Sequence, residues 1–243
     1  MKFYRTLQPC RAISFDLDDT LYDNREVIRQ AELHFIDYVK TRSEIAEFNQ
    51  EYWRSWRDRM AQQFPHLTHD VTAWRAETLT ALLQFQQKST VEIAQICQQA
   101  MAIFFEWRNK IQLPRETVEI LTALKPHYPL IAITNGNVDP MRVGLHYFDH
   151  YFRAGEAYPK GHFRAKPHPD MFHHCATTLN IAPQDILHVG DNLITDVQGA
   201  LQARCQAVWI NLSGETIAAF SEARLLPTVE INELSQLLAV TQQ

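Results

Sequence analysis

The chain alternates between two hydrophobic patterns. Short apolar runs occur near its start and through its second half, and polar residues or turns follow them. Runs of this length predict buried strands. Between about residues 24 and 111 the apolar residues instead recur at helical spacing, with one proline, Pro65, and no glycine. These patterns predict a helical segment inserted into an α/β region.

The helical segment divides into four predicted helices. The first begins near Asn24, because asparagine is a favourable N-cap. The second covers about 44–60 and the third about 70–85. The fourth begins with Ser89-Thr90-Val91-Glu92, a sequence typical of a capping box, and continues to about Arg108. Four antiparallel helices with short connections are typical of a small bundle.

Strands and helices alternate from Pro114 onward. The predicted buried strands are 130–134, 186–191 and 207–210, and an earlier one covers 12–15. The helices predicted between them lie at about 115–125, 169–179 and 195–203. This alternation predicts a parallel, doubly wound sheet and an α/β fold class.

Composition narrows the possible functions. Of the 243 residues, 46% are hydrophobic, which is enough for one sizeable core and a smaller appendage. A net charge of −5 argues against general nucleic-acid binding. Four scattered cysteines without a Cys-x-x-Cys pair predict free thiols. No apolar run reaches the length of a signal peptide or a membrane span, so we expect a cytoplasmic protein with no membrane contact.

Polar side chains follow three of the predicted strands. Asp16 and Asp18 follow the first, Thr134 and Asn135 end the second, and Asp191 ends the third. Burying a charge is costly, and open parallel sheets bind ligands beyond the carboxyl ends of their strands. Each acid alone could be an N-cap, but together they predict a site for a cation and a reaction.

Four segments, in this order, resemble the haloacid dehalogenase superfamily of phosphohydrolases. They are Asp16-Leu17-Asp18-Asp19-Thr20-Leu21, Ile133-Thr134-Asn135-Gly136-Asn137, Lys166-Pro167 and Gly190-Asp191-Asn192-Leu193-Ile194-Thr195-Asp196. The superfamily places its type-one cap just after the first motif, where the helical segment lies. The resemblance implies a Rossmann-like parallel sheet core formed by residues 1–21 and 114–243, with an inserted four-helix cap domain at 22–113.

The resemblance and the chemistry of the side chains together imply the catalytic roles. Asp16 would attack phosphorus and form an aspartyl-phosphate. Asp18 would protonate the leaving alcohol and then activate water. The implied cofactor is Mg²⁺, held by the Asp16 carboxylate, the Asp18 main-chain carbonyl and Asp191. Lys166, Thr134 and the amide of Asn135 would contact the phosphoryl oxygens.

Two further polar residues, Asp196 and His188, lie close to these groups in the sequence. Asp196 would brace Lys166 or metal-bound water as a supporting group, or it could simply begin a helix at its favourable positive end. His188 precedes the end of the third strand, and we interpret it as a packed residue rather than a catalytic one.

Several segments, some of which overlap these motifs, resemble enterobacterial phosphatases of this superfamily that act on flavin mononucleotide and on 5-amino-6-(5-phospho-D-ribitylamino)uracil, an intermediate of riboflavin biosynthesis. These segments are Phe3-Tyr4-Arg5, Asp16 to Asn24, His69 to Arg75, Ala132 to Asn137, Ile186 to Asp191 and Arg224-Leu225-Leu226-Pro227. In the cap, Trp74 and Arg75 are candidate substrate contacts, because a flat ring stacks on tryptophan beside a cation. Alternatively, the cap tryptophans fill the bundle core and the arginines extend to solvent.

We therefore expect a Mg²⁺-dependent phosphatase acting on a small-molecule phosphate ester. The alternatives are a broad-specificity sugar or nucleotide phosphatase, a phosphomutase, a haloacid dehalogenase and an inactive relative that only binds ligands. The second acid, Asp18, argues against a dehalogenase, and the intact motifs argue against an inactive relative. The sequence leaves the oligomeric state open.

Overall fold

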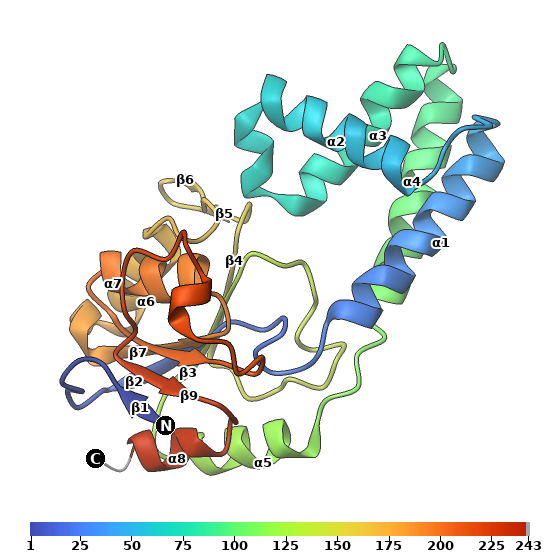
Figure 1. Cartoon of the computed structure of the whole chain (residues 1–243). Helices are drawn as coiled ribbons and strands as arrows, with labels where there is room; N and C mark the ends of the chain where they lie inside the picture. Colours follow the sequence, from blue (N-terminus) through green and yellow to red (C-terminus); the bar gives the residue numbers. More distant parts are fainter. Residues whose placement is uncertain (242–243) are drawn as a thin grey trace. The chain divides into compact units, whose positions relative to one another are not determined.

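The computed structural model describes residues 1–241, which form two compact units, called here the α/β unit and the helical unit. The α/β unit consists of Met1–Asp23, Gln112–Gly136 and the chain from Gly144 onward. The helical unit consists of Asn24–Ile111 and Asn137–Val143. Figure 1 shows the elements of both units along the chain.

A seven-stranded sheet is the centre of the α/β unit as far as the chain is described, with the strand order β1-β9-β8-β7-β2-β3-β4. All neighbouring strands are parallel except β1 and β9. The predicted parallel sheet is confirmed, and the antiparallel edge strand β1 is an addition that was not predicted from the sequence. The central strands are buried along their whole length, as expected of a sheet covered on both faces. The strands are β1 (Lys2–Phe3), β2 (Ala12–Phe15), β3 (Leu130–Thr134), β4 (His150–Arg153), β7 (Ile186–Gly190), β8 (Gln206–Ile210) and β9 (Val229–Ile231), and β5 (Ala157–Tyr158) and β6 (Gly161–His162) pair separately.

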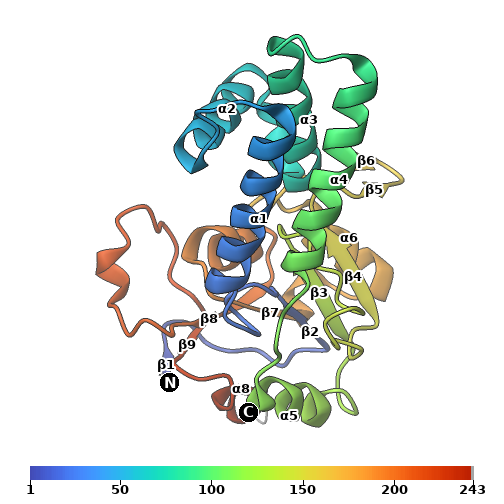
Figure 2. The ribbon, with the colours of Figure 1, turned by 90° about the vertical axis from the view of Figure 1, so that its right-hand side faces the viewer.

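Helices cover both faces of the sheet, as the two views in Figures 1 and 2 show. Alternate strand residues, such as Ala12 of β2 and Ile131 and Ile133 of β3, share one core cluster with residues of α6 and α7. The intervening strand residues point to the face that carries α5 and α8. The helical segments of this unit are α5 (Arg115–Leu124), α6 (Asp170–Leu179), η2 (Pro183–Asp185), the π-helical turn η3 (Leu193–Gln198), α7 (Gly199–Gln202), η4 (Ile217–Ala219) and α8 (Gln236–Thr241).

The helical unit contains the four predicted helices around a core of its own. The Ser89–Glu92 capping box is confirmed, with both reciprocal hydrogen bonds present. The predicted start of the second helix at residue 44 is wrong, because the first helix runs to Ser43 and the left-handed Glu44 ends it. The second helix begins only after Asn49, which caps it. The elements are α1 (Arg25–Ser43), α2 (Gln50–Gln63), η1 (Pro65–His69), α3 (Val71–Phe85) and α4 (Thr90–Arg108).

Two expectations for this unit need correction. Asn24 precedes α1 but makes no side-chain cap there, because its Oδ1 atom accepts a hydrogen bond from Arg108 Nη1 at 2.9 Å instead. Residues 137–143, expected in the sheet core, group with the helical unit. The reason is a set of side-chain bonds: Asn137 donates to Thr72 Oγ1 at 3.2 Å, and Arg108 Nε donates to Asn137 Oδ1 at 3.3 Å.

No helix within residues 1–241 combines the length and the apolar character that crossing a lipid bilayer requires.

Candidate active site

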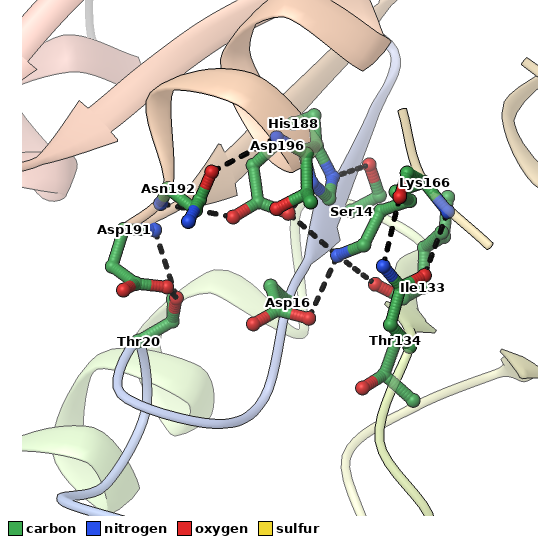
Figure 3. A network of polar contacts seen from close by, with 12 residues as sticks. Ser14, Asp16, Thr20, Ile133, Thr134, Lys166, His188, Asp191, Asn192 and Asp196 are labelled. Atoms are coloured by element: carbon green, nitrogen blue, oxygen red, sulfur yellow. Dashed lines mark hydrogen bonds and ion pairs between the residues drawn. The ribbon is translucent and has the colours of Figure 1, made fainter. Parts of the chain in front are cut away.

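Three neighbouring strands, β7, β2 and β3, end in polar residues at one edge of the sheet. Asp16 follows the last residue of β2, Thr134 is the last residue of β3, and Asp191 follows β7. Since parallel strands place their carboxyl ends together, these side chains gather in one region, which Figure 3 shows.

Lys166 lies at the centre of this region with its side chain almost fully buried. Its Nζ atom donates to Asp16 Oδ1 at 2.7 Å, to Asp196 Oδ1 at 2.6 Å and to the carbonyl of Ile133 at 2.7 Å. The Asn135 side chain fixes the main chain of Lys166: it accepts from the Lys166 amide at 2.7 Å and donates to the Lys166 carbonyl at 2.9 Å. Strand β3 and the loop after it therefore hold the ammonium in place.

Burial and neighbouring charges set the protonation of this cluster. Burial alone would lower the pKa of Lys166, but Asp16 and Asp196 raise it, so the amine stays an ammonium. Burial would raise the pKa of Asp196, but Lys166 and His188 hold it below its usual range. Burial raises the pKa of Asp16 well above its usual value, despite the opposing ammonium. Burial and the nearby charges of Asp196 and Asp19 raise the pKa of Asp191 to about 7.

The acids of the site suit a divalent cation. Asp16, Asp191 and Asp196 each offer a carboxylate oxygen, and these atoms lie within 4.8 Å of one another. One ammonium faces three carboxylates, so a further positive charge is needed for all of them to ionise. Within residues 1–241 the hydrogen bonds to the carboxylates of Asp16 and Asp191 use only their Oδ1 atoms, whereas both carboxylate oxygens of Asp196 are engaged. The donor set therefore fits Mg²⁺, which prefers oxygen ligands, with Asp16 and Asp191 as the better-placed acids.

Two hydroxyl groups that we did not single out from the sequence support the acids. Thr20 Oγ1 donates to Asp191 Oδ1 at 3.3 Å and accepts from the Asp191 amide at 3.1 Å. Tyr22 Oη donates to Asp18 Oδ1 at 2.8 Å, and Asp18 itself is half-buried in the loop after β2. The sequence held a clue to both, because each hydroxyl lies within six residues of Asp16.

Glycine at position 190 makes room for Asp196. A Cβ atom there would lie 2.4 Å from both Cβ and Cγ of Asp196, closer than real atoms approach. The Asp196 carboxyl group therefore packs directly against the end of β7, beside Lys166. This placement favours the bracing role over that of a simple helix start, although Asp196 also lies within the turn η3.

His188 is packed, as expected, but it is also hydrogen-bonded. The residue is fully buried on β7, its Nδ1 atom lies 2.9 Å from Ser14 Oγ, and its Nε2 atom lies 3.4 Å from Asp196 Oδ1. The sequence held a clue to the bond between these two residues, because His188 in β7 and Ser14 in β2 are polar residues among apolar neighbours.

The helical unit contains the two candidate substrate contacts, Trp74 and Arg75, at the start of α3. Arg75 is buried, and its guanidinium donates to Glu32 at 3.0 and 2.6 Å, which is a structural ion pair between α3 and α1. Trp74 is half-buried, and Arg57 stacks over its ring at 4.2 Å. Trp53 and Trp56, by contrast, are part of the core of the helical unit, in keeping with the core-filling alternative.

Comparison with known proteins agrees with this geometry. The model of the haloacid dehalogenase-like hydrolases matches residues 10–204. The chain is 38% identical over 242 residues, 99% of its length and 100% of the relative's, to 5-amino-6-(5-phospho-D-ribitylamino)uracil phosphatase YigB of Escherichia coli (strain K12). It is 28% identical, over 86% of its length and 85% of the relative's, to N-acylneuraminate-9-phosphatase of Rattus norvegicus.

Among solved structures, 2-haloacid dehalogenase from Pseudomonas syringae pv. Tomato DC3000 matches with a TM-score of 0.86 and 30% identity, covering 96% of this chain and 98% of that one. The family match takes in β2, the helical insertion and the strand ends that carry the site. The chain therefore belongs to the haloacid dehalogenase-like hydrolases.

Proposed function

We propose that the protein is a Mg²⁺-dependent phosphatase that hydrolyses small-molecule phosphate monoesters through a covalent intermediate on Asp16. The observation that carries the proposal is the convergence on Lys166: its ammonium contacts Asp16 and Asp196, and Asp191 lies beside them. Such a site pairs a carboxylate nucleophile with positive charge for the transferring phosphoryl group. The relatives named as phosphatases support the same reaction.

In the first half-reaction, an Asp16 oxygen bonds to phosphorus while the bond from phosphorus to the alcohol oxygen breaks. Asp18 gives its proton to that departing oxygen. In the second half-reaction, water attacks phosphorus, transfers a proton to Asp18 and releases the Asp16 carboxylate. Each residue returns to its starting state, so the cycle consumes one water for each ester.

The remaining polar groups hold the phosphoryl oxygens. Lys166 supplies a fixed positive charge, and the main-chain amide of Asn135 supplies a donor. Thr134 Oγ1 accepts from the Gly136 amide at 2.9 Å, which leaves its hydroxyl proton for a phosphoryl oxygen. Mg²⁺, held by Asp16, Asp191 and the Asp18 carbonyl, would supply the charge that a phosphate dianion needs beside these acids.

For the substrate we propose 5-amino-6-(5-phospho-D-ribitylamino)uracil, with flavin mononucleotide as a second ester that the site accepts. The support is the identity with the E. coli phosphatase of that name, which extends along 99% of this chain and so includes the helical unit. Both molecules join a flat heteroaromatic ring to a ribityl phosphate. A broad-specificity sugar or nucleotide phosphatase is the alternative.

A phosphate-release screen tests the activity. The purified protein is assayed against a panel of phosphate esters, including these two, with Mg²⁺ and with EDTA. We expect Mg²⁺-dependent release that is lost in Asp16→Asn, since an amide is a poor nucleophile. Asp37→Asn, an exposed acid on α1, is the control and should keep full activity. Release by Asp16→Asn at the wild-type rate would contradict the assignment of the nucleophile.

The same panel separates two other reactions of the superfamily. A phosphomutase would isomerise a sugar phosphate without releasing phosphate. A dehalogenase would release halide from 2-haloacids, and it deserves testing because a solved neighbour carries that name. We expect no halide, because Asp18 provides a second acid that a dehalogenase does not need. Measured phosphate release against isomerisation decides between the phosphatase and the phosphomutase.

Trp74 provides a test of substrate choice. We expect Trp74→Ala to raise KM for flavin mononucleotide far more than KM for a small aryl phosphate. The reason is that the large ring system of flavin mononucleotide would stack on the Trp74 indole. Trp107→Ala is a matched control, since Trp107 lies in α4 and stacks instead on His34. Equal effects of Trp74→Ala on both substrates would exclude a recognition role.

A further inference from the structure

A buried hydrogen-bonded chain leads from strand β2 to Lys166. Ser14 of β2 and His188 of β7 are paired directly across the parallel strands, and Ser14 Oγ lies 2.9 Å from His188 Nδ1. On its other side the imidazole reaches Asp196 Oδ1 at 3.4 Å, and that oxygen also accepts from Lys166 Nζ at 2.6 Å. Figure 3 shows the chain end to end.

The chemistry of the partners fixes the protons along this chain. An ionised carboxylate only accepts hydrogen bonds, so the proton between His188 and Asp196 belongs to Nε2. Burial lowers the pKa of His188 to about 4, so the ring is neutral near pH 7 and its Nδ1 atom is an acceptor. The Ser14 hydroxyl is therefore the donor to Nδ1.

These residues do not form a hydrolytic triad. Ser14 and His188 are both fully buried, so neither can reach a substrate. The acid also lies on Nε2 and the serine on Nδ1, which is the reverse of the arrangement that activates a serine. Their effect must pass through Asp196.

Three donors hold the two oxygens of Asp196. Oδ1 accepts from Lys166 and His188, and Oδ2 accepts from the Asn192 amide at 3.0 Å. The close approach of Gly190 limits movement of the carboxyl group toward β7. Without His188, the Lys166 ammonium and one amide would be the hydrogen-bond donors left to this carboxylate among residues 1–241. The ammonium would then be held less firmly against Asp16.

We propose that His188 is a positioning residue, whose Nε2–H bond orients Asp196 and thereby keeps the Lys166 ammonium on Asp16. The Asp196 carboxylate selects the tautomer that makes this bond, and Ser14 donates to the Nδ1 atom that this tautomer leaves as an acceptor. The inference rests on the proposed function, because it assumes that Asp16 and Lys166 act on a phosphoryl group.

Two substitutions separate the hydrogen bond from the bulk of the ring. His188→Gln can place an amide donor near the position of Nε2, whereas the shorter side chain in His188→Asn reaches only the position of Nδ1. We expect His188→Asn to lower kcat by about tenfold or more, as groups that orient reacting side chains do. His188→Gln should retain most of kcat, and KM should change little in both, because His188 does not touch the substrate.

Other outcomes of this comparison would overturn the proposal. The proposal fails if His188→Asn keeps the wild-type kcat, or if kcat falls by the same factor in His188→Gln and His188→Asn. Thermal melting of both variants shows whether a loss of kcat follows a loss of folded protein. If neither variant folds, the wild-type protein provides the second measurement.

That second measurement is the tautomer of His188, observed by long-range proton–nitrogen NMR of protein with labelled histidine. The signal is assigned by its absence in His188→Gln, or by elimination among the 11 histidines. We expect a neutral ring with its proton on Nε2 near pH 7. A ring protonated on Nδ1, or on both nitrogens, would overturn the proposal.

The two experiments distinguish this inference from the proposed function. A wild-type protein that releases phosphate from no ester contradicts the proposed function. If the wild-type protein releases phosphate and His188→Asn has the same kcat, the proposed role of His188 is contradicted. The proposed function then stands.

Discussion

Each acid of the proposed site has a neighbour that restrains it. Asp16 and Asp196 share the Lys166 ammonium, Asp191 bonds to Thr20, and Asp18 bonds to Tyr22. Buried carboxylates need such partners because desolvation penalises their charge. The restraint also prepares the reaction, since charged groups already in place need not reorganise when the phosphoryl group is transferred.

The bond from Tyr22 to Asp18 predicts a kinetic effect. Tyr22→Phe removes the hydroxyl that lies 2.8 Å from Asp18 Oδ1 but keeps the buried ring. We expect kcat to fall by about tenfold, a part of the roughly 10²- to 10⁴-fold that a well-placed general acid supplies. KM for small phosphate esters should change less, and both constants follow from steady-state phosphate release.

Tyr4→Phe is the matched control for Tyr22→Phe. Tyr4 follows the edge strand β1, and its hydroxyl donates to Glu230 at 2.6 Å. Its loss should leave kcat unchanged. If the two variants had the same kcat, the Tyr22 hydroxyl would have no part in placing Asp18.

Among the elements, those with a strong local pattern could be predicted from the sequence. The apolar runs gave β2, β3, β7 and β8, and helical spacing gave α1, α3 and α4 within a few residues. The short strands β1, β4 and β9 have no such run and form only because a neighbour pairs with them. The break near residue 44 was predicted, but the irregular segment 44–49 before α2 was missed.

The residues of the candidate site also differ in whether a local sequence pattern predicts them. Asp16, Thr134 and Asp191 could be predicted because each stands at the end of an apolar run. Lys166 required the family resemblance, because nothing local distinguishes it from an ordinary loop lysine. The bonds from His188 to Asp196 and from Asn135 to Lys166 depend on tertiary pairing, which spacing along the chain does not reveal.

Helix pairing within the helical unit predicts the effect of changing Arg75. Its guanidinium joins α3 to Glu32 of α1 and lies 3.7 Å from the centre of the Phe104 ring. Arg75→Met would leave Glu32 with Arg57, at 3.8 Å, as its one cationic partner in the described part of the chain. We expect the free energy of unfolding, measured by urea denaturation, to fall by about 3 kcal/mol, as when one partner of a buried ion pair is removed.

A surface pair provides the control for Arg75→Met. Arg115 pairs with Glu119 within α5 and has a side chain that is 91% exposed, so Arg115→Met should change the free energy of unfolding by less than about 1 kcal/mol. The Arg75 variant also tests the substrate contact expected from the sequence. A higher KM with unchanged stability would favour that contact over the structural ion pair.

For the molecule as a whole, the buried acids link stability, pH and Mg²⁺. The pKa of Asp191 rises to about 7 in the folded protein, whereas an aspartate in the unfolded chain has its usual pKa of about 4. Between these values the folded state binds the proton that the unfolded state releases. Stability therefore falls as the pH rises through this window, by at most about 1.4 kcal/mol per pH unit for one group. Asp16, also raised, acts in the same direction. His188, whose pKa is lowered to about 4 in the folded protein, opposes one of these two acids up to its unfolded pKa of about 6.5, so the net effect of the three groups is still a fall.

Mg²⁺ binding should reverse this loss, because the cation takes the place of the proton on Asp191. In EDTA we expect the melting temperature to fall between about pH 5 and about pH 7. Added Mg²⁺ should raise the melting temperature more at the higher pH, because fewer molecules then carry a proton on Asp191 that the cation must displace. In Asp191→Asn the melting temperature should depend less on pH, and added Mg²⁺ should raise it less. In Asp37→Asn both effects on the melting temperature should remain. A Mg²⁺ effect that is equal at the two pH values would show that the cation does not compete with a proton at these acids.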